Sequence, residues 1–525
     1  MKNAKLPYAL IAALLLLVLV GAKGIKTPTN DPITNHYRKL PGAVPEWIKT
    51  LPWGKTVNIA DYQGATDDER LEKARTALLS KGGGVLYFPA GTYSFKDNLD
   101  IPNGVILRGA DPGAFKEATD EGYTLATRFE FPKYIPSFTG DGTPNSTAFK
   151  AITADASAAN VGIVNIAINR GHVEFREAGD HNTASNRFVF GCILTNTAAA
   201  DPGVPDIQSG NKPFQRWNAR HQPAIQVYAG LNAYVANNRI PKSGDDNFTF
   251  PEYTLTRAMP GGTGSVKSNE IITLKNAVVF DYDNRPGIYV NGFSLPEGTP
   301  QTHPYAFRKG SLIRDNYIYC TGRSAIFFSG DGTICSYNVI RFPADVWRPT
   351  VTGRATTDGS STNDNRGLTM RGYRWTAEGN DYIVHSNRSF TKGYINDGEG
   401  IMHERWANCT VIDSKIINNR GNRYLCLWSV DINGLLIQGN HVSDDGDPPI
   451  HVLGGKGGVH NLHIINNDVD CDINLRGIRV SAPEYSNIEI RGNRFVGKGT
   501  AKMSLQDTTW AKGNTGFVVE TIQKK

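Results

Sequence analysis

The chain has 525 residues, of which 39% are hydrophobic and 20% are charged, and its formal net charge is +6. This apolar fraction suffices for a large core, and the length fits either two or three domains or one long repetitive domain. The positive charges are spread without a basic block, so the sequence indicates no nucleic-acid partner. The six cysteines are scattered and Cys335 falls on an apolar strand position, which favours buried free thiols over a disulfide framework or a zinc site.

Residues 1–22 have the pattern of a secretory signal peptide. Lys2 and Lys5 precede an apolar run from Tyr8 to Val20, and small residues up to Ala22 offer a cleavage site. The alternative, a membrane anchor, is weaker because the run is shorter than the roughly 20 residues that span a bilayer. We therefore expect a secreted or periplasmic protein without a stable membrane anchor.

The next segments predict an extended arm and a helix. Residues 23–56 contain several prolines and two tryptophans, and we expect them to lie along the main domain. A helix is predicted over 67–81, with Asp67 as its N-cap. It would cover the open apolar end of a repetitive domain spanning 57–510, with 511–525 as a tail. The apolar residues expected on one face of this helix are Leu71, Ala74, Leu78 and Leu79.

A short pattern recurs from Val235 to Phe495: an apolar residue, two variable residues, an asparagine, a variable residue and an apolar residue. From Asn387 onward its steps are 27, 26, 27 and 26 residues. Such a period indicates a solenoid, in which each unit buries its apolar residues only against its neighbours. The positions assigned to the pattern are Asn238, Asn269, Asn316, Asn338, Asn387, Ser414, Asn440, Asn467 and Asn493.

The repeating unit is predicted to be β-structure. Its apolar residues form short alternating runs rich in Ile, Val, Phe and Tyr, interrupted by Gly, Asn and Asp. An asparagine at a tight bend can adopt left-handed backbone angles, and stacked asparagines can form a hydrogen-bonded ladder. The sequence thus predicts an all-β, right-handed, single-stranded parallel β-helix with an N-terminal capping helix.

Three segments resemble the opening of the pectate lyase superfamily. They are Val57–Asp61, Gly82–Tyr93 and Ile101–Gly109, and the asparagine-containing coils extend the resemblance loosely to residue 495. The resemblance implies a right-handed β-helix and, usually, action on a polysaccharide. It leaves the reaction open, because lyases, hydrolases, epimerases and phage tailspikes share this opening.

The second strand of each coil follows the pattern small–apolar–x–apolar–x, as in Gly287–Asn291. Alternation turns the apolar residues inward and creates two outward columns, with neighbours about 4.8 Å apart. Their mixture of rings, amides, an arginine and a carboxylate is typical of a sugar-binding cleft rather than of an ordinary solvent face. One column is Gln226, Tyr289, Phe327, Thr369, Met402, Cys426, His451 and Arg479; the other is Tyr228, Asn291, Ser329, Arg371, Glu404, Trp428, Leu453 and Ser481.

Two long connections, 293–309 and 343–366, flank the same strand of this face. Long loops on a rigid scaffold usually carry function, so we expect them to wall a groove; tolerated surface insertion is the alternative.

Arg371 and Glu404 lie one coil apart in one column and are the main catalytic candidates. In β-elimination on a uronate polymer, Arg371 would neutralise the carboxylate or act as the base, helped by Arg405 or Arg423. In hydrolysis, Glu404 would act with a second carboxylate, and Asp397 and Glu399 are candidates in the adjoining bend. The alternative is a salt bridge without a catalytic role.

The remaining candidates are binding residues. Aromatic side chains of the columns would stack on sugar rings, although packing under a loop is a competing interpretation. The predicted substrate-binding residues are Tyr289, Asn291, Phe327, Ser329, Arg423, Trp428 and His451. Asp444, Asp445 and Asp447 form an acidic bend that is either a Ca²⁺ site or a solvated turn.

These observations predict an exported enzyme that cleaves an acidic polysaccharide in a groove over residues 287–430. A β-eliminating lyase is favoured, a glycoside hydrolase is second, and a non-catalytic glycan-binding or adhesion solenoid is third. Apart from the possible Ca²⁺ no cofactor is indicated, and a monomer is expected.

Overall fold

The computed structural model describes residues 27–112, 117–132, 150–176, 184–197, 223–241, 247–260, 266–280, 287–291, 308–319, 324–342, 366–384, 399–403, 410–444, 447–471 and 476–523. Of 247–260, 266–280, 342, 399–400, 402–403 and 429 it describes only the backbone. The predicted signal peptide lies outside these ranges, as do residues 292–307 and 343–365, which make up nearly all of the two predicted long connections.

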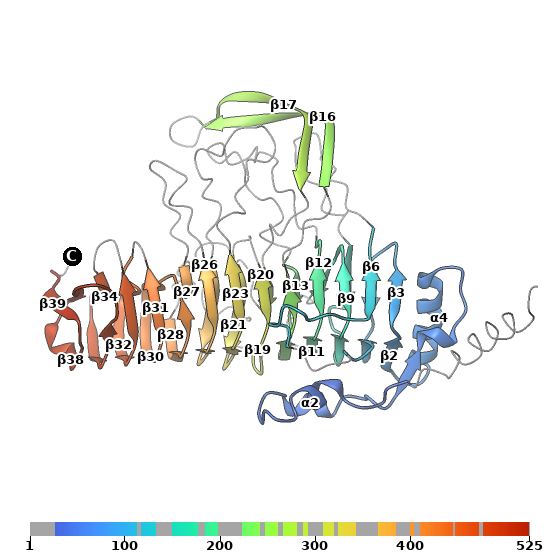
Figure 1. Ribbon diagram of the computed structural model, residues 1–525, viewed down its shortest axis with the longest axis horizontal. Helices are drawn as coiled ribbons and strands as arrows, with labels where there is room; N and C mark the ends of the chain where they lie inside the picture. The colour runs from blue at the N-terminus through green and yellow to red at the C-terminus, as the bar shows by residue number, and fades with distance from the viewer. Residues whose placement is uncertain are drawn as a thin grey trace, which may run out of the picture.

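The chain winds into a right-handed parallel β-helix (Figure 1), as the sequence predicts. Its strands stack into three rows, here numbered in the order in which a coil visits them. Row 1 comprises β4 (Leu99–Ile101), β7 (Lys150–Ala154), β10 (Gly171–Phe175), β13 (Ile225–Val227), β18 (Ile288–Val290), β21 (Ser324–Asp331), β24 (Arg366–Tyr373), β27 (Glu399–His403), the first parts of β30 (Leu425–Gln438) and β32 (Ile450–Ile465), β34 (Arg476–Ser481), β37 (Ala501–Leu505) and β39 (Phe517–Thr521).

Row 2 includes the second parts of β30 and β32. The other row 2 strands are β1 (Thr56–Asn58), β2 (Gly84–Phe88), β5 (Val105–Gly109), β8 (Val161–Val164), β11 (Ser185–Phe190), β14 (Leu231–Ala236), β19 (Leu312–Arg314), β22 (Ile334–Ser336), β25 (Thr376–Glu378), β28 (Thr410–Ile417), β35 (Tyr485–Arg491) and β38 (Ala511–Lys512). Row 3 comprises β3 (Gly91–Ser94), β6 (Thr127–Glu130), β9 (Ala167–Asn169), β12 (Ile193–Thr195), β15 (Arg239–Ile240), β20 (Tyr317–Tyr319), β23 (Val339–Phe342), β26 (Asp381–Val384), β29 (Arg420–Gly421), β31 (His441–Asp444), β33 (Asp468–Cys471) and β36 (Arg494–Phe495).

The core runs along the inside of the three rows. Ile288, Ile326 and Leu368 occupy equivalent positions of successive row 1 strands, and all three are fully buried. Because each coil presents its inward residues directly above those of the coil before, one continuous apolar core forms along the solenoid.

A ladder of asparagines lines the bend between rows 2 and 3. Each Nδ2 donates to the Oδ1 of the next asparagine at 2.9–3.0 Å, and each backbone N–H donates to the same oxygen. These bonds satisfy buried polar groups that would otherwise destabilise the core. The members are Asn238, Asn316, Asn338, Asn380, Asn419, Asn440, Asn467, Asn493 and Asn514.

Two positions that the sequence pattern assigned to this ladder are wrong, and a third lies outside the described residues. Asn269 belongs to a hairpin strand, where it pairs with Ala258. Ser414 lies within β28, and Asn419 holds the ladder position of that coil. Asn387 is not described, while Asn380 makes the ladder bonds. The apolar residues around these positions have the same spacing as the pattern. Insertions in the coils, however, shift the ladder asparagine away from the evenly spaced position.

The left-handed conformation falls on the residue before each ladder asparagine, not on the asparagine itself as predicted. Asn237 has φ 54°, Gly379 63° and Gly439 66°. The turn therefore precedes the asparagine, whose own side chain points into the bend to join the ladder. Gly and Asn at these preceding positions tolerate the positive φ.

The capping helix α4 (Asp67–Leu79) covers the N-terminal end (Figure 1). Its N-cap is Thr66, which accepts from the backbone N–H of Glu69 at 3.2 Å, so the prediction of Asp67 as N-cap is off by one residue. Leu71, Ala74 and Leu78 are buried, whereas Leu79 is 42% exposed because it turns away from that face.

The N-terminal arm carries α2 (Pro32–His36) and α3 (Glu46–Lys49), followed by the 3₁₀ turn η1 (Ile59–Asp61) at the start of the solenoid. The arm packs on the outer side of row 2, where Ile33 and Trp53 share an apolar cluster with Phe188 and Tyr234. Tyr37 donates from its hydroxyl to Asp315 at 2.8 Å. The arm thus crosses several coils.

Three further features complete the described chain. The strands β16 (Asn247–Pro260) and β17 (Val266–Phe280) form a separate antiparallel hairpin (Figure 1), and η8 (Thr508–Trp510) lies near the C-terminal end. The described cysteines Cys192, Cys335, Cys426 and Cys471 are all buried, and Cys192 and Cys335 are free thiols, as expected. Within the described ranges, no helix is both long and apolar enough to cross a membrane.

Candidate functional site

The two outward columns predicted from the sequence exist on row 1. Tyr289 pairs with Phe327, and Cys426 pairs with His451, which in turn pairs with Arg479. In the second column Ser329 pairs with Arg371. Successive strands are about 4.8 Å apart, so each column is a line of close neighbours.

The columns are buried, which the sequence did not predict. Tyr289 and Phe327 are each 3% exposed, and their rings meet edge to face at a centroid distance of 5.4 Å. The expectation of rings exposed on an open face is therefore wrong. Side chains that stack in register shield one another, a contribution that alternation alone cannot reveal.

Asn291 and Ser329 are also buried, and the amide of Asn291 is bonded within the protein. Its Oδ1 accepts from the backbone N–H of Ala229 at 2.8 Å, and its Nδ2 donates to Ser311 at 3.3 Å. Its φ is 50°. These contacts give Asn291 a scaffold role at the end of β18, and its predicted contact with substrate remains a prediction.

Arg371 has the most unusual environment in the second column. Only 2% of the residue is exposed, yet its Nε and Nη1 have no hydrogen-bond partner among the described residues. Buried polar groups are normally satisfied, and each nitrogen that is left without a hydrogen-bond partner costs about 1–3 kcal/mol. These two nitrogens therefore single out Arg371 as a candidate site residue.

His451, in the first column, is 3% exposed, and neither ring nitrogen has a hydrogen-bond partner in the part of the chain that the structure describes. Its ring meets that of Trp428 edge to face at 4.9 Å, and Tyr424 lies at 6.5 Å. Burial, together with the charges of Arg479 and Arg476, lowers the pKa of His451 to about 3. The imidazole is therefore neutral at neutral pH.

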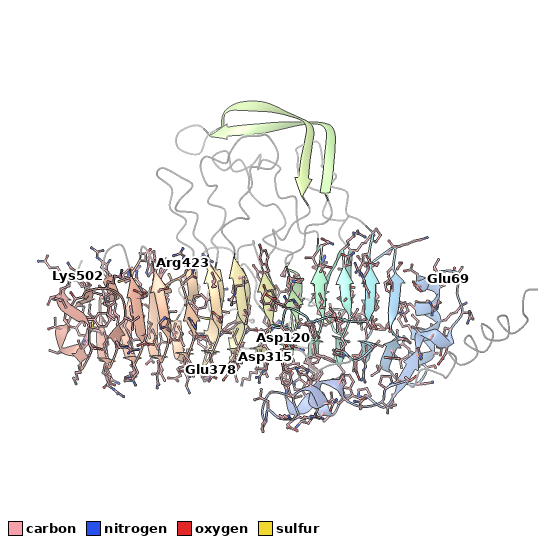
Figure 2. All side chains as sticks on the ribbon, in the orientation of Figure 1. Glu69, Asp120, Asp315, Glu378, Arg423 and Lys502 are labelled. Atoms are coloured by element: carbon pink, nitrogen blue, oxygen red, sulfur yellow. The ribbon has the colours of Figure 1, made fainter. Side chains whose placement is uncertain are left out.

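Cationic side chains predominate among the described residues of the C-terminal half of row 1. Figure 2 shows Arg423 and Lys502 along one side of the solenoid, with Asp315 and Glu378 on the opposite side of the same view. Lys502 pairs with Glu520 of the last strand at 2.9 Å. The cationic side chains described on or next to the row 1 strands from β24 to β37 are Arg366, Arg371, Arg374, Arg423, Arg476, Arg479 and Lys502.

The other end of row 1 carries an internally paired cluster. Glu174 of β10 accepts from Arg176 at 2.7 Å, and His172 lies 3.6 Å away. Burial alone would raise the pKa of Glu174, but the bonds to His172 and Arg176 outweigh it and lower the pKa to about 2. Glu174 is therefore ionised and neutralised by its neighbours.

Several predicted catalytic residues lie outside the described part of the chain. These are Asp397, Glu404 and Arg405, and Glu399 contributes only its backbone, which pairs with Arg366. Met370 pairs with His403, so the register that would bring Arg371 beside Glu404 is maintained up to the last described residue before Glu404. Arg423 lies two residues before the start of β30 and is buried. The catalytic roles of these residues remain predictions.

The predicted Ca²⁺ site gains no support from the described residues. Asp444 accepts the backbone N–H of Tyr424 through Oδ2 at 3.0 Å and that of Asp447 through Oδ1 at 2.9 Å. Asp445 lies outside the described ranges, within which no group of three metal-binding side chains occurs. Carboxylate oxygens that already accept hydrogen bonds from backbone N–H groups are typical of a tight turn rather than of a cation site.

The comparisons with known proteins show a likeness in fold alone. No family model matches the chain, and no curated protein matches its sequence. Among solved structures, the mannuronan C-5 epimerase A-module of Azotobacter vinelandii is 11% identical, with a TM-score of 0.36 over 89% of this chain and 94% of that one. The Streptococcus pneumoniae adhesin PfbA is 12% identical, with a TM-score of 0.41 over 87% and 91% of the two chains. The tailspike of Escherichia coli bacteriophage HK620, in complex with a pentasaccharide, is 12% identical, with a TM-score of 0.44 over 86% and 70%.

Two groups that shape the site were missed at the sequence level. Arg479 was placed in a column but not recognised as a site residue, although it directly follows His451 in that column. The cluster of His172, Glu174 and Arg176 was not recognised at all. Its alternation of polar and apolar residues along β10 is visible in the sequence and would have revealed it.

Proposed function

We propose that this protein acts on an acidic polysaccharide that lies along row 1, and that it cleaves the polymer by β-elimination. The observation that supports the proposal most strongly is Arg371, a buried guanidinium whose Nε and Nη1 have no described partner. A uronate carboxylate presents the planar pair of acceptors that a guanidinium matches.

The charge of row 1 supports an acidic rather than a neutral substrate. Two cations described on or beside this half of the row have carboxylate partners: Lys502 pairs with Glu520, and Arg374 pairs with Asp331. The excess of cationic side chains among the described residues would raise the local concentration of an oppositely charged polymer and speed its association.

The chemistry requires three tasks. A base removes the proton from the sugar carbon next to the carboxylate, and the electron pair forms a carbon–carbon double bond to the neighbouring carbon. The glycosidic C–O bond at that neighbour breaks, and the departing oxygen takes up a proton. Arg371 would bind the carboxylate and stabilise the negative charge that develops on it. Arg423 and Arg405 are proposed to assist from the ends of adjacent strands.

A screen of purified protein against acidic and neutral polysaccharides tests this proposal. We expect an acidic polymer to yield products that absorb in the near ultraviolet through the new double bond. The variant Arg371→Gln should lower the rate by about a hundredfold or more, the usual effect of removing a group that stabilises transition-state charge. The control Arg374→Gln changes a 55% exposed arginine three residues away, paired with Asp331 at 2.5 Å, and should keep full activity.

The other outcomes identify the alternatives. Reducing ends without ultraviolet absorbance would indicate a glycoside hydrolase that uses Glu404 and a second carboxylate, because hydrolysis creates no double bond. Retention of an acidic polymer without any product would indicate a binding or adhesion solenoid. If the protein neither cleaves nor retains any acidic polymer, the proposal is refuted.

Export belongs to the proposal as well. Residues 1–22 have the charge and apolar pattern of a signal peptide. Expression of the full chain in a secreting host should give a mature protein that begins directly after Ala22, outside the cytoplasm. Recovery of the protein in the cytoplasm with Met1 still present would contradict export.

A further inference from the structure

A second group of buried, unpartnered polar atoms lies on row 1, away from Arg371. His451 of β32 is 3% exposed and Arg479 of β34 is partly exposed; both ring nitrogens of His451 and the Nε of Arg479 are buried without a described hydrogen-bond partner. The two residues pair directly in register, so their side chains project from neighbouring strands on the same face. Orphaned polar atoms at one site are rare in a well-packed protein.

The surroundings of this pair favour an anion over a neutral group. Arg476 adds a second positive charge from β34. Cys426 and Trp428 of β30 lie on the same side, and Tyr424 directly precedes that strand. Among the described residues of this face, Glu520 of β39 interacts with Arg476 but is bonded to Lys502 and Ser504. A ligand that accepts from Arg479 and from one His451 nitrogen would satisfy the buried donors and neutralise the local charge.

We propose that His451 and Arg479 form a second anion-binding subsite for the same acidic polysaccharide, separate from the position of Arg371. This inference rests on the proposed function. It adds that the substrate carries closely repeated acidic groups, so that one chain engages both positions. An occasional acidic sugar in a neutral polymer would occupy only one of them.

The strand register sets the distance between the two positions. From β24 through β27 and β30 to β32 there are three steps, and a fourth leads to β34. At a strand spacing of about 4.8 Å, Arg371 and the pair are separated by about 14–19 Å along the axis. One sugar unit is similar in length to one strand spacing, so a chain of about four or five units is needed to reach both.

The contact with Trp428 indicates how the second subsite holds a sugar. Its ring stands edge to face against His451 at 4.9 Å, at an interplanar angle of 77°. This packing fixes the orientation of the imidazole before any ligand arrives. A preoriented donor loses little conformational entropy on binding, which strengthens the interaction.

Binding of uronate oligomers of defined length tests the inference. Galacturonate and mannuronate oligomers of two and six units are titrated into the wild-type protein and four variants: Arg371→Gln, Arg479→Gln, His451→Phe and the control Arg491→Gln. Arg491 lies on row 2, is 48% exposed and pairs with Glu489. It therefore carries the same side chain as Arg479 but lies outside the proposed subsite. Far-ultraviolet circular dichroism verifies folding, and Arg479→Gln alters a partly exposed side chain.

We expect the six-unit oligomer to bind wild-type protein more tightly than the two-unit oligomer. Arg479→Gln and His451→Phe should each weaken binding of the longer oligomer by about ten- to a hundredfold, the usual contribution of a charge-assisted hydrogen bond. The two-unit oligomer should lose affinity chiefly with Arg371→Gln, and Arg491→Gln should change neither.

Three outcomes would count against the inference in distinguishable ways. If the six-unit oligomer keeps its full affinity in Arg479→Gln and His451→Phe but loses it in Arg371→Gln, the second subsite is refuted while the proposed function stands. If both oligomers bind with equal affinity, the substrate does not span two positions and the inference is refuted. If neither oligomer binds wild-type protein and the polysaccharide screen is also negative, the proposed function itself has failed.

Discussion

Replacing a ladder asparagine tests the coil register, from which the positions of all site residues follow. Asn419 is 1% exposed, and its Oδ1 accepts from the backbone N–H and from Nδ2 of Asn380, both at 2.9 Å. Its Nδ2 donates to Ala377 and to Asn440 at 2.9 and 3.0 Å. Asn419→Ala leaves the two donors of Asn380 buried and unsatisfied, at about 1–3 kcal/mol each, so we expect a loss of about 2–6 kcal/mol in the free energy of unfolding.

The matched control is Ser414→Ala in the same coil. Ser414 donates from Oγ to the backbone oxygen of Ile412 at 2.8 Å and belongs to no ladder. Removing that single bond should cost about 0.5–1.5 kcal/mol. Equilibrium urea denaturation followed by tryptophan fluorescence measures both. A cost for Ser414→Ala equal to or larger than that for Asn419→Ala would refute the ladder register.

Three further predictions follow from burial. The His451 imidazole has a folded pKa of about 3 against an ordinary 6.5, so the unfolded chain binds more protons between these values and stability falls as pH decreases through this range. At pH 5 the loss is about 2 kcal/mol, and His451→Phe should flatten the dependence of the urea midpoint on pH between 7 and 5; a His451→Phe variant that keeps the wild-type slope would contradict this prediction. Leu78→Ala should destabilise the cap by about 2–5 kcal/mol and Leu79→Ala by less than about 1, measured by thermal unfolding; equal costs would contradict the docking of α4. Burial raises the pKa of the Cys192 thiol to about 12, so a thiol reagent should label Cys192 only after denaturation, and labelling of Cys192 in the native protein would contradict its burial.

The fold could be predicted because its signals are local and repeated. Alternating apolar residues and bend residues recur in every coil, and one solenoid follows from many weak copies of the same pattern. The even period wrongly assigned Asn269 and Ser414 to the ladder. Both residues have the expected spacing, but neither lies at the bend between rows 2 and 3. The ladder bond, which distinguishes Asn419 from Ser414, is a contact between coils and is not visible in one coil alone.

The candidate site was only partly predictable for the same reason. Alternation correctly placed Arg371 and His451 on outward columns. Burial depends on what neighbouring coils and connections cover, so the sequence could not show that both residues are almost completely buried. The orphaned atoms that single them out are a property of the packed structure.

The most direct measurement is a crystal structure of the protein with a six-unit uronate oligomer from the polymer that the screen identifies. The account predicts an oligomer extended along row 1 from β24 to β34. One carboxylate should accept from Arg371 and another from Arg479 and His451. An oligomer bound along row 2 or row 3, with Arg371 and His451 still unpartnered, would contradict the account.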